Sequence, residues 1–406
     1  MRKRKIKFWL LIILLSSALQ QPCFGKDTGP YITQGNCDGF PKIDLKVAPS
    51  ICIGVVATNL HMARGVAAIG PEIYVTDLGD WSKGKGRLLH IGNHGQGKPE
   101  VILDHLDEPN SLAPAPGGTL YMGLLGKIIQ YDPTAHTTRD VVVNLPTEGK
   151  HPLAAFSVAP DGSLFINIGS ATDHCEKGDG SVPDPVVPCP ETVSHTPPRG
   201  SLLHVMPQAE PVNAQIITPY AVGMRNSMAL AVSPSGKLYD AVNARDAINQ
   251  ADPGLSDEDL PHDTFNRVEQ GKDYGWPYCY DNNIPSPEYP QYDCSKKQLP
   301  TLLLPAHAAP LGMLFYTGRF LPSFHNKLVI GYHGYRKQGH RIVTLALNKN
   351  GLPKSAPIEI VGDWDMKPGN HPQGSPVSLF EYEDGSILIV EDRNGTLLRI
   401  SRESSR

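Results

Sequence analysis

The 406-residue sequence has no C-x-x-C-H motif and no C-x-x-C pair, so it carries neither a covalently attached haem nor the spacing common in zinc sites. It has no long basic run, and its net charge of −4 argues against binding of nucleic acid. The apolar run at 8–19 is too short to span a bilayer comfortably. Only 175–195 mixes Cys with His, so a zinc site there is the alternative reading of the cysteines.

Residues 1–25 have the composition of a secretory signal peptide. Five basic residues precede the apolar run, and Cys23 and Gly25 are small residues before a cleavage site at Lys26. A retained membrane anchor or a lipid-anchored Cys23 would be the alternatives. Five of the 37 basic residues and none of the 41 acidic ones lie in this segment, which leaves 32 and 41, net −9. We expect a periplasmic or secreted protein with no stable membrane insertion after cleavage.

Six cysteines remain after removal of the signal peptide, and they fall into three close couples. An even number of cysteines in an exported protein is typical of a disulfide framework. Several connectivities are open to six cysteines, and their spacing favours local pairing. We predict the disulfides Cys37–Cys52, Cys175–Cys189 and Cys279–Cys294.

Gly and Pro, with 39 and 38 residues, make up about one residue in five, which suits many short strands joined by turns. One unit recurs six times: a strand, a turn such as Pro160–Gly162, an apolar-aromatic strand, and a further strand. The apolar-aromatic strands begin at Ile73, Leu120, Leu164, Leu238, Leu328 and Ile387. Six such units predict an all-β fold, a six-bladed β-propeller.

The predicted propeller covers 51–406, after an extension at 26–50 that we expect on the outside of the fold. Two separate β-sandwiches are the alternative, but no low-complexity linker divides the chain. The longest intervals between units contain the Pro-rich run Val182–Pro198 and the stretch Ala247–Pro305. We therefore predict loop insertions between blades three and four and between blades four and five, where sites are often built.

Polar motifs are densest between Gly223 and Cys279, where the predicted fourth blade begins. Arg225 is a forked donor suited to a carboxylate or a quinone oxygen, and Asn226 can donate and accept beside it. The turn Asn243–Asp246 follows a strand and could direct backbone carbonyls toward a hard cation such as Ca²⁺. The structural alternatives are ion pairing between blades for Arg225 and a capped turn for the second motif.

These motifs, taken in order, resemble the glucose/sorbosone dehydrogenases, soluble quinoproteins that use pyrroloquinoline quinone (PQQ) on a six-bladed propeller. The resemblance runs from about Arg64 to Ile400. Its strongest part is Gly223–Tyr280, which contains G-x-R-N, N-x-R-D and D-Y-G-W-P-Y-C. His307 to Leu311, Phe315 to Gly318, His333-Gly334 and Asp392-Arg393 are also similar to the family.

The resemblance implies a PQQ- and calcium-dependent dehydrogenase of sugars or sugar-derived aldehydes. His151, nine residues before Pro160, would be the base that takes the proton of a sugar hydroxyl. The remaining implied site residues divide into two groups. Those for the cofactor are Arg225, Asn226, Arg64, Asn110, Arg336 and Arg393, and those for Ca²⁺ are the carbonyls of Ala244 and Arg245 with Asp246.

The sequence departs from the family pattern at several of these positions. Ser170 stands where some members have an acid that orients the His, and Ala155, Thr317, Ala244 and Asn110 also differ. Two other functions therefore stay open: a propeller that binds a ligand or protein without redox chemistry, and a metal-dependent hydrolase or lactonase. Because the chain has no haem motif, a dehydrogenase would need a separate electron acceptor, a soluble cytochrome or a quinone.

Overall fold

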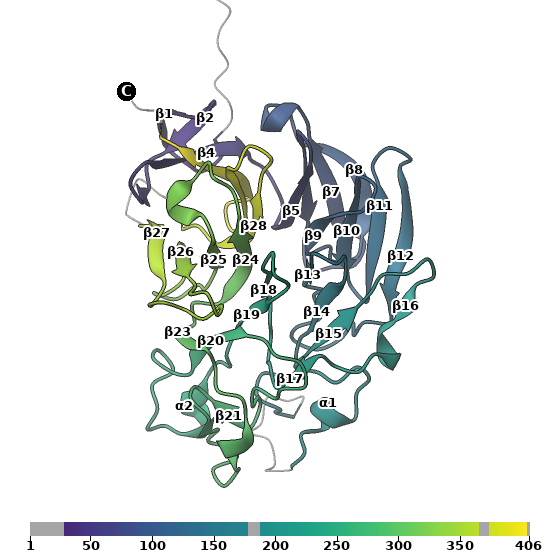
Figure 1. Cartoon of the computed structure of the whole chain (residues 1–406), viewed down its shortest axis with the longest axis vertical. Helices are drawn as coiled ribbons and strands as arrows, with labels where there is room; N and C mark the ends of the chain where they lie inside the picture. Colours follow the sequence, from purple (N-terminus) through teal and green to yellow (C-terminus); the bar gives the residue numbers. More distant parts are fainter. Residues whose placement is uncertain (1–27, 178–186, 365–372, 404–406) are drawn as a thin grey trace, which may run out of the picture.

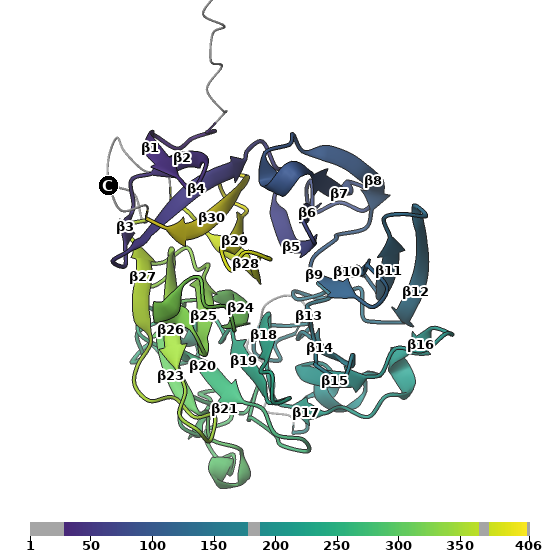
Figure 2. The ribbon, with the colours of Figure 1, turned by 45° about the horizontal axis from the view of Figure 1, so that its top comes forward.

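The computed structural model describes residues 28–177, 187–364 and 373–403. These residues form six sheets arranged in a ring (Figures 1 and 2), and a two-stranded hairpin outside them. The predicted six-bladed propeller is thus confirmed. Within the described ranges, no helix has the length and apolar character needed to cross a membrane.

Each of the first three blades is a sheet of four strands, extended in blade two by a fifth strand. Blade one contains β5 (Ala63–Ile69), β6 (Glu72–Asp77), β7 (Gly86–Ile91) and β8 (Glu100–Leu106). Blade two contains β9 (Leu112–Ala115), β10 (Thr119–Leu124), β11 (Lys127–Asp132), β12 (Thr137–Val143) and β16 (Val212–Asn213). Blade three contains β13 (Phe156–Val158), β14 (Leu164–Ile168), β15 (Ser201–Val205) and β17 (Ala221–Val222).

Of the last three blades, blades five and six also take strands from the N-terminal part of the chain. Blade four contains β18 (Ala229–Val232), β19 (Leu238–Val242), β20 (His262–Arg267) and β23 (Leu302–Ala306). Blade five contains β24 (Pro310–Tyr316), β25 (Lys327–Tyr332), β26 (Arg341–Ala346), β27 (Ile358–Gly362) and β3 (Lys46–Val47). Blade six contains β28 (Pro376–Glu381), β29 (Ile387–Glu391), β30 (Thr396–Arg402), β4 (Ile51–Ala57), β2 (Phe40–Ile43) and β1 (Thr33–Cys37).

The second strand of each blade is the part that the sequence pattern predicts best. The six predicted apolar-aromatic strands all fall in second strands: β6, β10, β14, β19, β25 and β29. In β29 every residue from Ile387 to Glu391 is buried. Because each sheet packs against a neighbouring blade on both faces, these strands are buried on both sides and mainly apolar, and they do not alternate.

The ring closes by strand pairing between distant parts of the chain. In blade six, β4 pairs antiparallel with β30, so that Val55 lies opposite Leu398. The extension before β4 adds β2 and β1 to the edge of the same sheet, and β3 joins blade five beside β27. The apolar side chains on these strands form one core cluster with blades five and six.

The three predicted disulfides are confirmed. Their Cα–Cα distances are 5.7 Å for Cys37–Cys52, 6.3 Å for Cys175–Cys189 and 6.0 Å for Cys279–Cys294. All three lie within the usual range for a bridge. In each case local spacing identified the correct partner.

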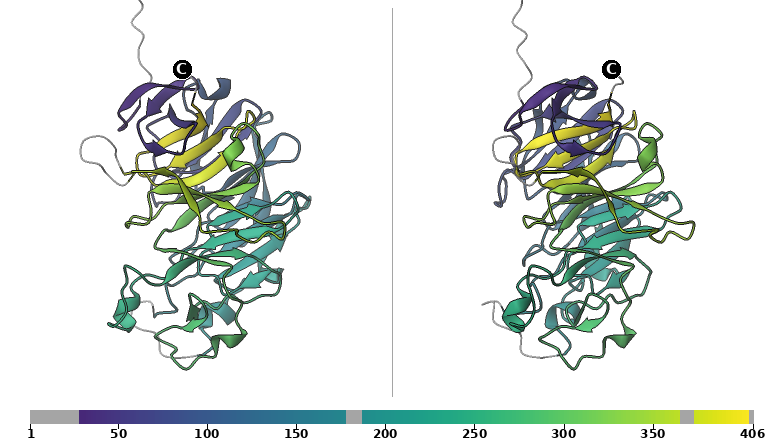
Figure 3. Two further views of the ribbon diagram at one scale, coloured as in Figure 1. Left: turned by 60° about the vertical axis from the view of Figure 1, so that its left-hand side comes forward. Right: turned by 90° about the vertical axis from the view of Figure 1, so that its left-hand side faces the viewer.

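The long insertions lie inside blades, which corrects their predicted position. The first separates β14 from β15 within blade three, and the second occupies 243–261 and 268–301 within blade four. The prediction was wrong because intervals between second strands also contain the third and fourth strands. The insertions carry α1 (Pro190–Val193), α2 (Ile248–Ala251) and the hairpin β21 (Cys279–Tyr280) and β22 (Ile284–Pro285), grouped at one end of the molecule (Figures 1 and 3).

Four short 3₁₀ turns complete the described elements: η1 (Asn93–Gly95), η2 (Ala214–Ile216), η3 (Cys294–Lys296) and η4 (Pro322–Phe324).

The two insertions pack against each other through a small core. Cys189 from blade three and Tyr278, Cys279 and Tyr289 from blade four share one buried cluster. The backbone N–H of Cys189 also donates to the Tyr278 hydroxyl. The two disulfide-linked insertions therefore form one structural unit.

Candidate active site

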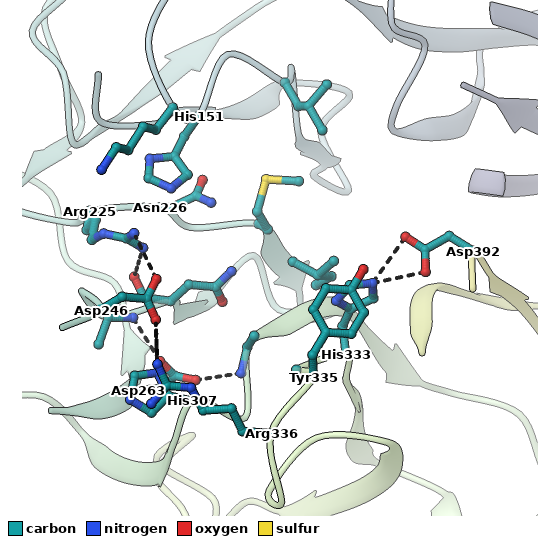
Figure 4. Close-up of a pocket in the computed structure, with 18 of the residues that line it drawn as sticks. His151, Arg225, Asn226, Asp246, Asp263, His307, His333, Tyr335, Arg336 and Asp392 are labelled. Carbon is teal, nitrogen blue, oxygen red and sulfur yellow. Dashed lines mark hydrogen bonds and ion pairs between the residues drawn. The ribbon is translucent and has the colours of Figure 1, made fainter. Parts of the chain in front are cut away.

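A cavity of about 420 Å³ opens at one rim of the propeller (Figure 4). Its walls come from segments that lead into a first strand, such as His151 before β13 and Arg225 before β18, or that follow a second strand, such as Asp246 after β19. In an antiparallel pair, the start of one strand and the end of its neighbour lie at the same edge. The topology thus collects these residues at one rim, and the volume is typical of a small-molecule site.

His151 is held in one orientation by Ser170. The ring Nδ1 lies 3.0 Å from the Ser170 carbonyl oxygen and 2.9 Å from its Oγ. The Ser170 hydroxyl donates to the carbonyl of Thr172 at 2.6 Å, so Oγ is left to accept. Both contacts place the proton on Nδ1 and leave the lone pair on Nε2. Ser170 thereby gives the orientation that an acid gives in some relatives.

The imidazole of His151 is neutral over the physiological range. Burial, and after it the nearby charge of Arg225, lowers its pKa to about 3. An anionic ligand in the cavity would oppose the effect of Arg225 and favour proton uptake. The chain after β14 passes close to the backbone of His151, and this close approach requires Gly169, because a Cβ there would lie 2.5 Å from the His151 carbonyl oxygen.

Arg225 and Asn226 lie beside His151 (Figure 4). The Arg225 guanidinium is 2.5 Å from the Asp173 carboxylate, and its Nε donates to the Asp173 carbonyl at 3.1 Å. Its Nη1 donates to the Asn243 carbonyl at 3.1 Å. The Asn226 side-chain oxygen accepts a hydrogen bond from Asn167 at 2.9 Å. Both predicted residues are buried, and fixed protein contacts set their orientation.

Asp246 is the carboxylate most exposed to the cavity, and three cationic groups surround it. Its oxygens lie 3.2 Å from His307 Nδ1, 3.5 Å from Arg336 and 3.9 Å from Arg225. The hydrogen bond from His307 lowers the pKa of Asp246. Burial disfavours the charged form of His307, but contact with Asp246 outweighs burial and the net pKa of His307 is raised. Asp246 and His307 therefore form an ion pair.

Asp263 lies beneath this ion pair. Its two oxygens accept the backbone N–H groups of Ala244 at 2.8 Å and Ala309 at 2.6 Å. Burial raises the pKa of Asp263 to about 6. This carboxylate holds the turn after β19 against the start of β24.

The opposite wall of the cavity is built around Asp392. Arg64 approaches its carboxylate at 2.9 Å and His333 Nε2 at 3.0 Å. Burial alone would raise the pKa of Asp392, but the hydrogen bond from His333 and the charge of Arg64 produce a net lowering. Asn110 does not line the cavity, and its side chain instead accepts from Arg64 Nε at 3.3 Å.

Two further predicted residues differ in their access to the cavity. Arg336 lines the wall and also pairs with Asp257 at 2.8 Å. Arg393 is not among the lining residues, and its guanidinium lies 5.5 Å from the ring of Tyr335, which does line the cavity. Arg393 therefore supports the wall from behind.

The predicted calcium turn supplies oxygen atoms to the cavity, and cationic groups surround its one carboxylate, Asp246. Ala244 and Asp246 line the cavity, whereas the Arg245 side chain turns away and pairs with the buried Glu288. The side-chain oxygen of Asn243 is buried without a hydrogen-bond partner in the described structure. That orphaned acceptor suits a cation or a donor ligand. The three cations around Asp246, however, oppose a metal ion on its carboxylate.

Several residues that shape the cavity were not predicted as site residues. His307, His333 and Asp392 stood in motifs similar to the family and could have been included on that signal. Asp263 and Lys150 carried no comparable signal, although Lys150 directly precedes His151 and lines the cavity. Asp173 lies in a polar insertion, and its contact with Arg225 depends on the fold.

Comparison with known proteins agrees with this architecture. The family model "Glucose / Sorbosone dehydrogenase" matches residues 127–352, more than half of the chain. An uncharacterised protein of Borreliella burgdorferi is 32% identical over 195 residues. That match spans 45% of this chain and about half, 48%, of the relative.

Solved structures show the same fold at low identity. A Trichoderma reesei protein of carbohydrate-active enzyme family AA12 has a TM-score of 0.73 and 18% identity, and covers 91% of this chain and 100% of its own. The PQQ domain of pyranose dehydrogenase from Coprinopsis cinerea has a TM-score of 0.68 and 17% identity, with 90% and 99% covered. The soluble aldose sugar dehydrogenase of Escherichia coli has a TM-score of 0.61 and 16% identity, with 87% and 100% covered. From its matched residues and its six-bladed architecture, the chain belongs to the glucose/sorbosone dehydrogenase family.

Proposed function

We propose that the protein is a PQQ-dependent dehydrogenase that oxidises a sugar or a sugar-derived aldehyde. One observation carries the proposal: a neutral histidine with a fixed tautomer shares a cavity with the guanidinium groups of Arg64, Arg225 and Arg336. A neutral imidazole can accept a proton, and guanidinium groups bind planar carboxylates. A base and anion-binding groups in one cavity suit a polyanionic redox cofactor.

The residues present fit PQQ, which has three carboxylates and a planar quinone. Arg225 and Asn226 would hold the quinone side, and Arg64 and Arg336 would face carboxylates. The unpartnered side-chain oxygen of Asn243, whose backbone carbonyl accepts from Arg225, supports a donor group or a cation at this place in the cavity. When bound, PQQ supplies a quinone that accepts a hydride, which no side chain can do.

His151 would act directly on the substrate. Its Nε2 would take the proton of the sugar hydroxyl while a hydride leaves the carbon that bears this hydroxyl, so the substrate is oxidised by two electrons. Ser170 keeps the other ring nitrogen protonated through both of its oxygens.

Calcium is part of the proposal because the Asn243–Asp246 turn offers oxygen ligands beside the cavity. The carbonyls of Ala244 and Arg245, Asp246 and the unpartnered oxygen of Asn243 are the candidate ligands. A bound Ca²⁺ would polarise a carbonyl oxygen as a Lewis acid. It would also offset the negative charge that a cofactor brings next to Asp246.

We further propose export to the periplasm or the outside of the cell and a separate soluble cytochrome or quinone as electron acceptor. Three disulfides support export, since such bridges persist in oxidising compartments. The signal peptide itself lies outside the described residues.

Titration of the purified protein with PQQ in the presence of Ca²⁺, followed by dye reduction with a panel of aldoses and aldehydes, tests the proposal. We expect saturable PQQ binding, sugar-dependent dye reduction, and loss of both on chelation of calcium. Binding of PQQ without turnover of any sugar would favour a redox-inactive binding protein.

A further inference from the structure

A short segment after β14, Ser170–Glu176, lies directly behind the cavity wall. Ser170 accepts a hydrogen bond from His151 Nδ1–H, and Asp173 binds Arg225 through both its carboxylate and its carbonyl. The Asp173 carboxylate also accepts the backbone N–H of Asp246 at 3.1 Å. One irregular segment therefore holds the candidate base, the candidate anion-binding arginine and the exposed carboxylate.

The same segment reaches a fourth lining residue. The Glu176 carboxylate binds Lys150 Nζ at 2.7 Å and accepts the backbone N–H groups of Asp173 and His174 at 2.8 Å and 2.7 Å. These contacts fold the segment into a compact loop. The loop thereby fixes the spacing between the groups that hold Lys150 and Arg225.

No β-ladder holds this loop, so other contacts must anchor it. At one end, Cys175 is bonded to Cys189. Two residues after Cys189, on α1, the buried Glu191 accepts the backbone N–H of Ala171 at 2.6 Å and the hydroxyl of Thr172. The segment Cys189–Glu191 thus contacts both ends of the loop, and the geometry of the loop depends on the disulfide.

A second anchor comes from the insertion of blade four. The Trp276 Nε1–H donates to the Asp173 carbonyl at 3.0 Å, the same oxygen that accepts from Arg225 Nε. A carbonyl fixed by two donors on its two lone pairs is a rigid acceptor. Besides its contacts with Arg225, Asp173 is thus held by Trp276 from the insertion of blade four and by Glu176 from its own loop.

We propose that Asp173 is a positioning residue for Arg225, and that the Cys175–Cys189 disulfide together with Glu191 fixes the position of Arg225 relative to His151. The role of this arrangement in PQQ binding rests on the proposed function, but the claim that Asp173 and the disulfide fix the position of Arg225 does not. Asp173 acts through Arg225 and Asp246 and does not line the cavity. The insertion therefore has a role in the site beyond stabilising the fold.

The disulfide Cys37–Cys52 provides a matched control. It closes a loop with a sequence separation of 15, against 14 for Cys175–Cys189, so in the chain-entropy model both bridges stabilise the fold to a similar extent. It joins β1 to β4 at the edge of blade six, and neither cysteine lines the cavity. Removing it should cost stability without disturbing the loop behind the site.

The experiment compares wild type with Asp173→Asn, Asp173→Glu, Cys175→Ser/Cys189→Ser and the control Cys37→Ser/Cys52→Ser. PQQ affinity is measured by titration, and hydrogen exchange of the Arg225 guanidinium N–H groups, Nη2 next to the Asp173 carboxylate in particular, is measured by NMR in the cofactor-free protein. We expect Asp173→Asn and the Cys175/Cys189 variant to lose about tenfold or more in PQQ affinity, typical of a lost orienting contact, and to exchange faster at Arg225. Asp173→Glu should recover part of both losses, and the control should keep wild-type values.

Wild-type affinity and wild-type Arg225 exchange in Asp173→Asn would overturn the proposal. So would an equal loss of affinity in both cysteine variants, since that pattern reports stability alone. If Cys175→Ser/Cys189→Ser does not fold, Glu191→Gln removes the neighbouring anchor and must show the same faster exchange. If wild type binds no PQQ, the proposed function fails, and Arg225 exchange alone decides this inference.

Discussion

At the scale of single residues, His151 and Arg225 have different expected roles because their contacts differ. His151 Nδ1 is occupied by Ser170, so the free Nε2 is available for chemistry. Arg225 has its Nε and both Nη groups in contact with fixed carbonyls or carboxylates, so it can orient a ligand but cannot move a proton.

This difference predicts opposite behaviour in two variants. His151→Ala should lower the rate of sugar oxidation by about 10²–10⁴-fold and keep PQQ binding, because loss of a general base affects the chemical step. Arg225→Ala should instead weaken PQQ binding. Titration and dye reduction on both variants measure the contrast, and native sugar oxidation by His151→Ala would remove His151 from the mechanism.

At the scale of the element, blade four contains a buried carboxyl group at its centre. Asp240 on β19 accepts hydrogen bonds from Ser227 at 2.8 Å and Asn266 at 2.9 Å, and no cation lies in contact with it among the described residues. Burial raises the pKa of Asp240 to about 7. The group is protonated in the fold at mildly acidic pH and charged above it.

Asp240→Asn should therefore change the pH dependence of stability. The folded pKa exceeds the unfolded value, so this group's contribution is fully present below about pH 4 and is lost as pH rises toward 7. The asparagine variant has no such loss and should be more stable than wild type at pH 8 by on the order of 2 kcal/mol, with little advantage at pH 4. Denaturant unfolding at both pH values measures the difference, and a difference that does not vary with pH would refute the assignment.

The elements also show which parts of the structure the sequence could predict. Second strands such as β29 are mainly apolar because blades cover both faces, and that signal is visible in the sequence. Local disulfides were predictable because close cysteines have few competing partners. The insertions were misplaced because spacing between strands does not reveal which strands share a sheet.

The site was predictable only in part, for a related reason. His151, Arg225 and Asn226 stand beside regular strands in ordered motifs, so their meeting at one rim follows from the blade pattern. Asp173, by contrast, lies in an irregular loop and reaches Arg225 across 52 residues of sequence. Such polar contacts between loops have no periodic signal, and the three-dimensional structure is needed to find them.

At the scale of the whole molecule, the expected mature charge of −9 has a consequence for electron transfer. An acidic donor favours a basic partner such as a small cytochrome, because opposite charges accelerate encounter. We predict that reoxidation of the reduced protein by such a cytochrome slows as ionic strength rises. Stopped-flow rates between low and high salt test this, and rates independent of salt would exclude electrostatic docking.

The account as a whole depends on sugar oxidation by the loaded propeller, and one measurement addresses it most directly. PQQ- and Ca²⁺-loaded protein is mixed anaerobically with excess aldose, without an electron acceptor, and the cofactor spectrum is followed through a single turnover. The account predicts reduction of about one equivalent of bound PQQ per chain in wild type, slowed by about 10²–10⁴-fold in His151→Ala. An oxidised spectrum that no sugar or aldehyde changes, with PQQ demonstrably bound, would contradict it.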